Sequence, residues 1–294
     1  SGGGVAAPSP SITNTTPTGF TVSWSAVPSA IAYRLDVATD SGFTSFVTGF
    51  NNLAVAGTSQ VVTGLSPQTT YYVRARSVAA SSSSSSVSQQ TSVQTSGLGN
   101  GLQAFYKLSD TSDSSGNGNT LTNNGGVSFS SGKIGDAAVF DGSNYLSVSD
   151  TFLPYGNSDR TFSLWLKTTS NSTAGIFCYG TSSWGNLIEM YHQNGKLIYT
   201  QYGDGLEPQN IINDGNWHHI VVTYDQVEYK MYIDNSLVST KSMTTNTIKN
   251  GTFTIGNGVD GYFDGQIDAV GIWNRALTLG EVSSLYNSGA GMEI

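Results

Sequence analysis

Hydrophobic residues recur along this chain with the period of two that β-strands require. In the segment TGFTVSW, the large apolar side chains of Phe20, Val22 and Trp24 occupy alternate positions. Similar short runs follow throughout, among them AYRLDVATD, TYYVRARSV, KLIYTQYG, WHHIVVTYD and EYKMYIDN. Turn residues separate the runs. The pattern predicts many short strands, each with one face in a core.

The segment RTFSLWLKTT shows what each face of a strand is expected to do. Its alternation predicts that Phe162, Leu164 and Leu166 point into a core, while Trp165 points to the opposite side. One helix is expected, near the C-terminus. There Thr278 and Glu281 have the spacing of a capping box, in which each side chain caps a backbone N–H of the first turn.

The strand-like runs fall into two groups, separated by the glycine-rich segment TSGLGNG. We expect a flexible lead over residues 1–8, a first domain over 9–96, a short linker over 97–101 and a second domain over 102–294. At 294 residues the chain is long enough for two domains with separate cores.

The first domain resembles the fibronectin type III family. The resemblance rests on an early-strand tryptophan, Trp24, and on the segment LSPQTTYY, in which Leu65, Pro67, Thr69 and Tyr71 form an L-x-P-x-T-x-Y corner. It implies an immunoglobulin-like sandwich in which Tyr71 stabilises a crossover turn.

The second domain resembles the laminin-G-like (concanavalin A-like) jelly-roll family. The motifs are an SGNGN loop, an FDG turn, a WHH strand, the FDGQID strand and a terminal helix. Together the two resemblances imply an all-β protein, with a fibronectin type III sandwich followed by a concanavalin A-like jelly-roll sandwich.

Composition and charge narrow the classes of partner. Residues 1–96 hold three arginines against two aspartates, whereas the remainder holds 9 basic and 18 acidic residues within a total net charge of −8. An acidic chain without Lys/Arg clusters argues against nucleic acid. No apolar run is long enough to span a membrane. The single cysteine, Cys178, lies in the apolar run GIFCYG and is expected to be a buried hydrophobic residue.

A calcium site is predicted in the loop DSSGNGN. Asp113, Asn117 and Asn119 offer oxygen ligands of the kind that Ca²⁺ prefers. The laminin-G-like resemblance implies that Asp268, in the FDGQID strand, completes the site. The alternative is an Asx-turn loop, with an Asp268 that accepts hydrogen bonds from backbone amides.

An aromatic cluster is the candidate ligand site. Sugars present C–H faces that pack on aromatic rings, while nearby polar groups bind their hydroxyls. The predicted ligand-binding residues lie between positions 176 and 203: Tyr179, Trp184, Tyr191, Tyr199, Tyr202 and Glu189. Trp184 is the first choice because TSSWGN reads as a loop. The alternative is that most of these rings are ordinary core residues.

Catalysis has little support in the sequence. A glycosidase needs two carboxylates at the scissile bond; the chain has five glutamates and no E-x-D-x-x-E motif. His218 and His219 are strand neighbours that point to opposite faces, so they cannot bind one metal together. We expect no enzyme.

The resulting hypothesis is a non-catalytic, extracellular adhesion or carbohydrate-binding protein. The jelly roll would recognise a glycan or host-surface ligand with calcium support, and the fibronectin type III domain would act as a spacer. It would act on a bacterial surface or a phage virion. The alternative is a structural phage protein, a fibre or capsid appendage that makes protein contacts and forms a homo-oligomer. A third alternative is an accessory fragment of a larger enzyme.

Overall fold

The computed structural model describes residues 5–16, 19–66, 69–80, 88, 90–95, 97–183, 185–201, 203–249, 251–292 and 294. The chain divides into two compact units, Ser1–Asn100 and Gly101–Ile294. The border falls inside the linker expected at 97–101. Residues 1–4 of the expected lead lie outside the described residues, and so do Trp184 and Tyr202.

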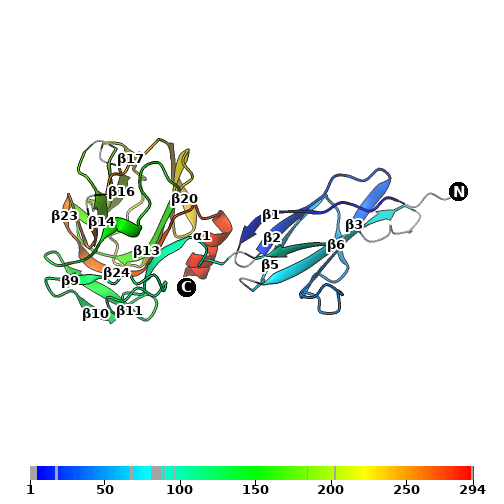
Figure 1. The fold of residues 1–294 in the computed structure, drawn as a ribbon, viewed down its shortest axis with the longest axis horizontal. Helices are drawn as coiled ribbons and strands as arrows, with labels where there is room; N and C mark the ends of the chain where they lie inside the picture. The colour runs from blue at the N-terminus through cyan, green and yellow to red at the C-terminus, as the bar shows by residue number, and fades with distance from the viewer. Residues whose placement is uncertain are drawn as a thin grey trace. The chain divides into compact units, whose positions relative to one another are not determined.

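The first unit is a sandwich of two antiparallel sheets (Figure 1). Its strands are β1 (Ser11–Thr16), β2 (Gly19–Ser23), β3 (Ala30–Ala38), β4 (Leu53–Val55), β5 (Ser59–Thr63), β6 (Thr70–Ala79) and β7 (Thr91–Gln94). One sheet has the order β1-β2-β5 and the other β4-β3-β6-β7. Trp24 and Tyr71 are buried between them. The Ser66 amide donates to the Tyr71 hydroxyl at 2.9 Å, which confirms the predicted tyrosine corner.

The second unit is a larger sandwich. Its strands before residue 170 are β8 (Leu102–Tyr106), β9 (Thr122–Asn124), β10 (Ser128–Ser131), β11 (Asp136–Asp141), β12 (Tyr145–Val148) and β13 (Arg160–Lys167), with a 3-10 turn η1 (Asp150–Phe152). Those after it are β14 (Ala174–Gly180), β15 (Leu187–Gln193), β16 (Lys196–Thr200), β17 (Gly205–Leu206), β18 (His218–Tyr224), β19 (Glu228–Ile233), β20 (Ser236–Ser242), β21 (Phe253–Ile255), β22 (Asn257–Gly258), β23 (Gly261–Tyr262) and β24 (Asp264–Trp273). Helix α1 (Leu279–Tyr286) and a 3-10 turn η2 (Asn287–Gly289) follow.

Two sheets form the layers of this unit. The eight-stranded sheet runs β10-β11-β24-β13-β18-β19-β20, with β8 also paired to β24. The nine-stranded sheet runs β17-β16-β15-β14-β21-β12-β9 and also includes the short hairpin β22–β23, whose second strand pairs with β14. The structure therefore confirms the prediction of an all-β chain with two sandwiches. Among the described residues, no helix has the length and apolar character needed to cross a bilayer.

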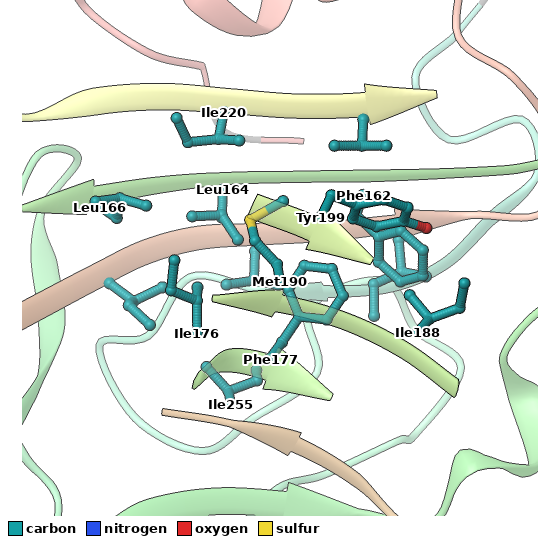
Figure 2. Close-up of a cluster of buried hydrophobic side chains, with 14 of the residues drawn as sticks. Phe162, Leu164, Leu166, Ile176, Phe177, Ile188, Met190, Tyr199, Ile220 and Ile255 are labelled. Atoms are coloured by element: carbon teal, nitrogen blue, oxygen red, sulfur yellow. The ribbon is translucent and has the colours of Figure 1, made fainter. Parts of the chain in front are cut away.

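The core lies between these two sheets. Phe162, Leu164 and Leu166 point inward from β13, as the alternation predicts. They meet apolar side chains of the opposite sheet, including Phe177 and Met190 (Figure 2). Phe162 and Phe177 stack with ring centroids 4.8 Å apart.

Helix α1 covers the outer side of the eight-stranded sheet. Trp165, on the outward side of β13, stacks on Tyr286 of the helix with ring centroids 5.8 Å apart. The predicted capping box is present: the Thr278 side chain accepts from the Glu281 amide, and the Glu281 side chain accepts from the Thr278 amide. Packing of one helical face onto Trp165 gives this eight-residue helix the tertiary support that a short helix needs.

Candidate functional site

The outer side of the nine-stranded sheet carries a group of polar and aromatic side chains. Strand alternation places Phe177 and Met190 in the core. Their neighbours Cys178, Glu189 and Tyr191 therefore face away from it. Cys178 and Glu189 are paired directly across β14 and β15, so their side chains lie next to each other.

A pocket of about 200 Å³ opens on this side of the sheet. It is bounded by β14, the start of β15, the segment around β21 and the hairpin β22–β23. The lining residues are Cys178, Tyr179, Gly180, Ser182, Leu187, Thr252, Thr254, Asn257, Gly258 and Val259. This volume is below the roughly 300–1,000 Å³ of most ligand pockets, so only a small group can occupy it.

The hairpin β22–β23 folds back across the sheet and forms one wall of the pocket. Gly258 packs against both Gly175 of β14 and the carboxylate of Glu189, and a methyl group added at Gly258 would overlap a Glu189 oxygen. Glycine at this position lets the hairpin backbone approach the sheet closely. As a result Glu189 is only 1% exposed.

Glu189 is a buried acid that has no cationic partner among the described residues. Its Oε1 accepts a hydrogen bond from the Asp260 amide at 3.3 Å. Among the described residues it forms no ion pair. Burial raises the pKa of Glu189 to about 7, and the nearby Asp260 carboxylate adds to the rise, although backbone amides of the hairpin oppose it. A desolvated acid beside a pocket is a common feature of functional sites.

Cys178 differs from the expectation of a buried hydrophobic residue. It is half-buried and lines the pocket. Partial burial, with Glu189 opposite, raises the pKa of its thiol to about 12. The thiol therefore stays protonated at neutral pH and is a poor nucleophile.

The predicted aromatic cluster is divided by the sheet. Tyr179 and Tyr199 are 1% and 0% exposed and belong to the core, so the prediction that they stack on a ligand at the surface is wrong. Although a Tyr179 atom reaches the pocket wall, its hydroxyl donates to the Pro154 carbonyl at 2.9 Å and accepts from Arg160 at 3.1 Å. Tyr191 is half-buried on the pocket side of β15. Trp184 and Tyr202 lie outside the described residues.

The residues predicted to bind calcium are all engaged with backbone groups. The Asp113 carboxylate accepts from the amides of Phe105, Ser115 and Asn119 at 2.9–3.1 Å. The Asn117 and Asn119 side chains donate to the Gln103 carbonyl, each at 3.0 Å.

The fourth predicted ligand, Asp268, has a different set of partners. Its carboxylate accepts from the amides of Lys133 and Ile134 at 2.7 and 2.8 Å. Within the described part of the chain, no group of three or more His, Cys, Asp or Glu side chains could hold a metal ion. The donor set thus fits the alternative of hydrogen-bonded loops better, and calcium stays a prediction.

The two adjacent histidines point to opposite sides of β18, as expected. His219 is buried beside Trp165, and its Nε2 lies 3.0 Å from the Ser163 hydroxyl. Burial lowers the pKa of His219 to about 3. His218 lies between the carboxylates of Asp234 and Asp214, at 2.7 and 3.1 Å. The hydrogen bond to Asp234 contributes most to raising its pKa.

The hairpin wall of the pocket has no clear pattern in the sequence. Asn257, Gly258 and Val259 come from the glycine-rich segment IGNGVDGYF. Beyond the hairpin, Tyr262 is 43% exposed and its ring centroid lies 6.0 Å from that of Tyr145. The close spacing of glycines was the only available indication that this backbone approaches another segment.

Family models match both units. Residues 6–94 match the fibronectin type III domain, and residues 140–283 match the concanavalin A-like lectin/glucanases superfamily. Human pentraxin-4 is 30% identical over 144 residues, an alignment that covers 42% of this chain and 30% of pentraxin-4. The chain therefore spans less than a third of that relative's length.

Two solved structures resemble the second unit. Domain 4 of AbnA, a GH43 extracellular arabinanase from Geobacillus stearothermophilus in complex with arabinotriose, is 27% identical, with a TM-score of 0.53, and the match covers 65% of this chain and 98% of that domain. The binding domain of Paraclostridial Mosquitocidal Protein 1 is 19% identical, with a TM-score of 0.55, and covers 66% of this chain and 53% of that structure. The second likeness concerns the fold alone.

Proposed function

We propose that the second domain of this chain binds glycans in the pocket beside the hairpin β22–β23. That domain belongs to the concanavalin A-like lectin/glucanases superfamily and follows a fibronectin type III domain. The observation that carries the proposal is the pocket itself. It is small, and its lining includes the hydroxyl or amide groups of Ser182, Thr252, Thr254 and Asn257. The arabinotriose complex of the similar arabinanase domain supports a carbohydrate as ligand.

The rest of the proposal concerns setting and role. The protein acts outside the cell, on a bacterial surface or a phage virion, and its fibronectin type III domain serves as a spacer. The similar domain belongs to an extracellular arabinanase, which supports this setting. The aromatic contacts come from Tyr191 and from Trp184, which follows the pocket residue Ser182 in sequence.

The proposed role is binding without hydrolysis. A glycosidase carries two carboxyl groups that reach the scissile bond. Glu189, the glutamate beside the pocket, lies under Gly258 and is 1% exposed, so it is shielded from a bound sugar. Incubation with each glycan that binds should leave the glycan intact, as measured by chromatography of the products.

A glycan array probed with the full chain tests the binding proposal. Ser182 is exposed and lines the pocket, so Ser182→Trp should fill it and weaken binding at least tenfold. Ser236→Trp is the matched control, because Ser236 is exposed on β20 of the other sheet. Trp184→Ala tests the stacking residue. An array without hits, or full affinity in both Ser182→Trp and Trp184→Ala, contradicts the proposal.

Calcium support of binding is a separate part of the proposal. An ion bound only by the folded state stabilises it by mass action. If Asp113, Asn117, Asn119 and Asp268 rearrange around Ca²⁺, removal of the ion with EDTA should lower the melting temperature by several degrees. An unchanged melting temperature with and without calcium contradicts a structural ion.

The alternative of a phage fibre or capsid appendage predicts assembly. Such a subunit forms closed homo-oligomers through self-complementary surfaces. Light scattering coupled to size exclusion distinguishes the two: a trimer or larger ring favours the virion role, and a monomer that binds glycans favours adhesion.

A further inference from the structure

The charge around the pocket indicates which glycans it takes. Of the ten described residues that line it, none is Lys, Arg, His, Asp or Glu. Ser182, Thr252, Thr254 and Asn257 instead supply hydroxyl and amide groups. Hydroxyl and amide groups pair with sugar hydroxyls, and the Thr254 hydroxyl would act as an acceptor because it already donates to the Asn257 carbonyl at 2.8 Å.

Two acidic groups lie behind this lining. Glu189 lies under Gly258, which is itself part of the pocket wall. Asp260 lies in the same hairpin, and its carboxylate acts on both Glu189 and Cys178. The titratable groups that face Glu189 are thus Cys178 from β14, Tyr191 from its own strand and Asp260 from the hairpin.

No cation offsets these acids in the described structure. Among the described residues neither Glu189 nor Asp260 is part of an ion pair. The sequence from residue 97 onward has 9 basic and 18 acidic residues, so the wider electrostatic field has the same sign. An anionic group in the pocket would meet carboxylates across a partly dehydrated wall, where charges interact more strongly than in water.

We propose that the pocket accepts a neutral sugar residue and rejects one that bears a carboxylate, sulfate or phosphate, with Glu189 as the residue that sets this preference through its charge. The proposal rests on the glycan-binding function proposed above and adds the class of ligand. Glu189 does not contact the sugar; Gly258 lies between them.

The hydrogen bond of Glu189 to the hairpin separates this electrostatic effect from a structural one. Glutamine at position 189 keeps an oxygen that can accept from the Asp260 amide, but it cannot ionise. Because burial raises the pKa of Glu189 to about 7, its charge is present at pH 8.5 and absent at pH 5.5. Selectivity that comes from this charge should therefore depend on pH in the native chain and not in the variant.

The test uses the full chain and an array that carries matched neutral and anionic glycans on the same linker. The pairs are glucose and glucuronic acid, galactose and galacturonic acid, and N-acetylglucosamine and its 6-sulfate. We expect the neutral member of each bound pair to bind at least tenfold tighter at pH 8.5. Equal or tighter binding of the anionic members overturns the inference but leaves the glycan-binding function standing. Failure to bind any glycan overturns both.

A second measurement follows the preference in Glu189→Gln. The neutral-to-anionic affinity ratio should fall several-fold at pH 8.5 and stay unchanged at pH 5.5. Glu228→Gln is the matched control, since Glu228 lies on β19 of the other sheet, and its ratio should equal that of the native chain. If Glu189→Gln weakens both ligand types equally, Glu189 supports the hairpin only and does not determine specificity.

Discussion

Glu281 at the start of helix α1 and Glu189 under the hairpin β22–β23 are both 1% exposed, yet their surroundings differ. Arg275 donates two hydrogen bonds to Glu281, at 2.7 and 2.8 Å, and Thr278 donates from its amide. Burial acts to raise the pKa of Glu281, but these donors outweigh it and lower the pKa. Glu189 has amide donors but no cation among the residues that the structure describes, and its pKa is raised to about 7.

The difference shows how two buried acids can serve different purposes. Glu281 joins the helix cap to the strand end at Arg275, and its charge is balanced inside the fold, which is typical of a structural ion pair. Glu189 lies next to a pocket, and its pKa is close to neutral pH. Because a buried and unbalanced acid weakens the fold when it ionises, its presence there favours a functional role over a structural one.

The largest loss of stability is expected when the carboxylate of Glu281 loses its cationic partner, Arg275. Arg275→Leu leaves the buried carboxylate without its cation and should lower the free energy of unfolding at pH 7 by about 3 kcal/mol. Urea denaturation followed by tryptophan fluorescence measures this. Lys196→Leu, at an exposed position on β16, is the control and should change it by less than about 0.5 kcal/mol. A loss below about 1 kcal/mol for Arg275→Leu would remove the contrast between the two acids.

An effect on stability of comparable size, but one that depends on pH, is expected at Glu189. The pKa of Glu189 in the folded chain is raised from its usual value of 4.5 to about 7. The stability it contributes is therefore fully present below pH 4.5 and is lost as the pH rises through 7. The native chain should lose up to about 3 kcal/mol relative to Glu189→Gln between pH 4.5 and 8, at about 1.4 kcal/mol per unit of pKa shift. The measurement is the free energy of unfolding of both proteins as a function of pH. If the two curves run parallel, Glu189 does not titrate as described.

The smallest effect is expected at the helix cap. Thr278→Ala removes one side of the capping box but leaves the Arg275–Glu281 pair in place, so it should cost about 1 kcal/mol. Thr278→Ser keeps the hydroxyl and is the matched control, which should retain most of the stability. Denaturation under the same conditions as for Arg275→Leu ranks the two contributions. A cost equal to that of Arg275→Leu would mean that the cap, and not the ion pair, dominates this region.

Much of the fold follows from local pattern. Alternation in RTFSLWLKTT predicts the inward side chains of Phe162, Leu164 and Leu166. The LSPQTTYY corner predicts the hydrogen bond of Tyr71, and the spacing of Thr278 and Glu281 predicts the cap. Each feature depends on residues close together in sequence, with a period or a spacing that only one local structure satisfies.

The pocket beside the hairpin β22–β23 could not be predicted from such local sequence patterns. Alternation shows that Glu189 and Tyr191 share one side of a strand. It does not show which side is buried, because β14 and β15 carry apolar residues on both sides. The sheet packing put Tyr179 and Tyr199 in the core and left Cys178 facing the pocket.

By itself, the sequence determined the strand periods, the two domains, the corner and the helix cap of this protein. Tertiary structure alone decided that Gly258, about 70 residues after Glu189 in sequence, covers that carboxyl group. The physical reason is that desolvation and charge balance depend on which distant segments pack together. The same glutamate on an open strand would titrate near its usual pKa, and under this hairpin it becomes the residue that gives the pocket its charge.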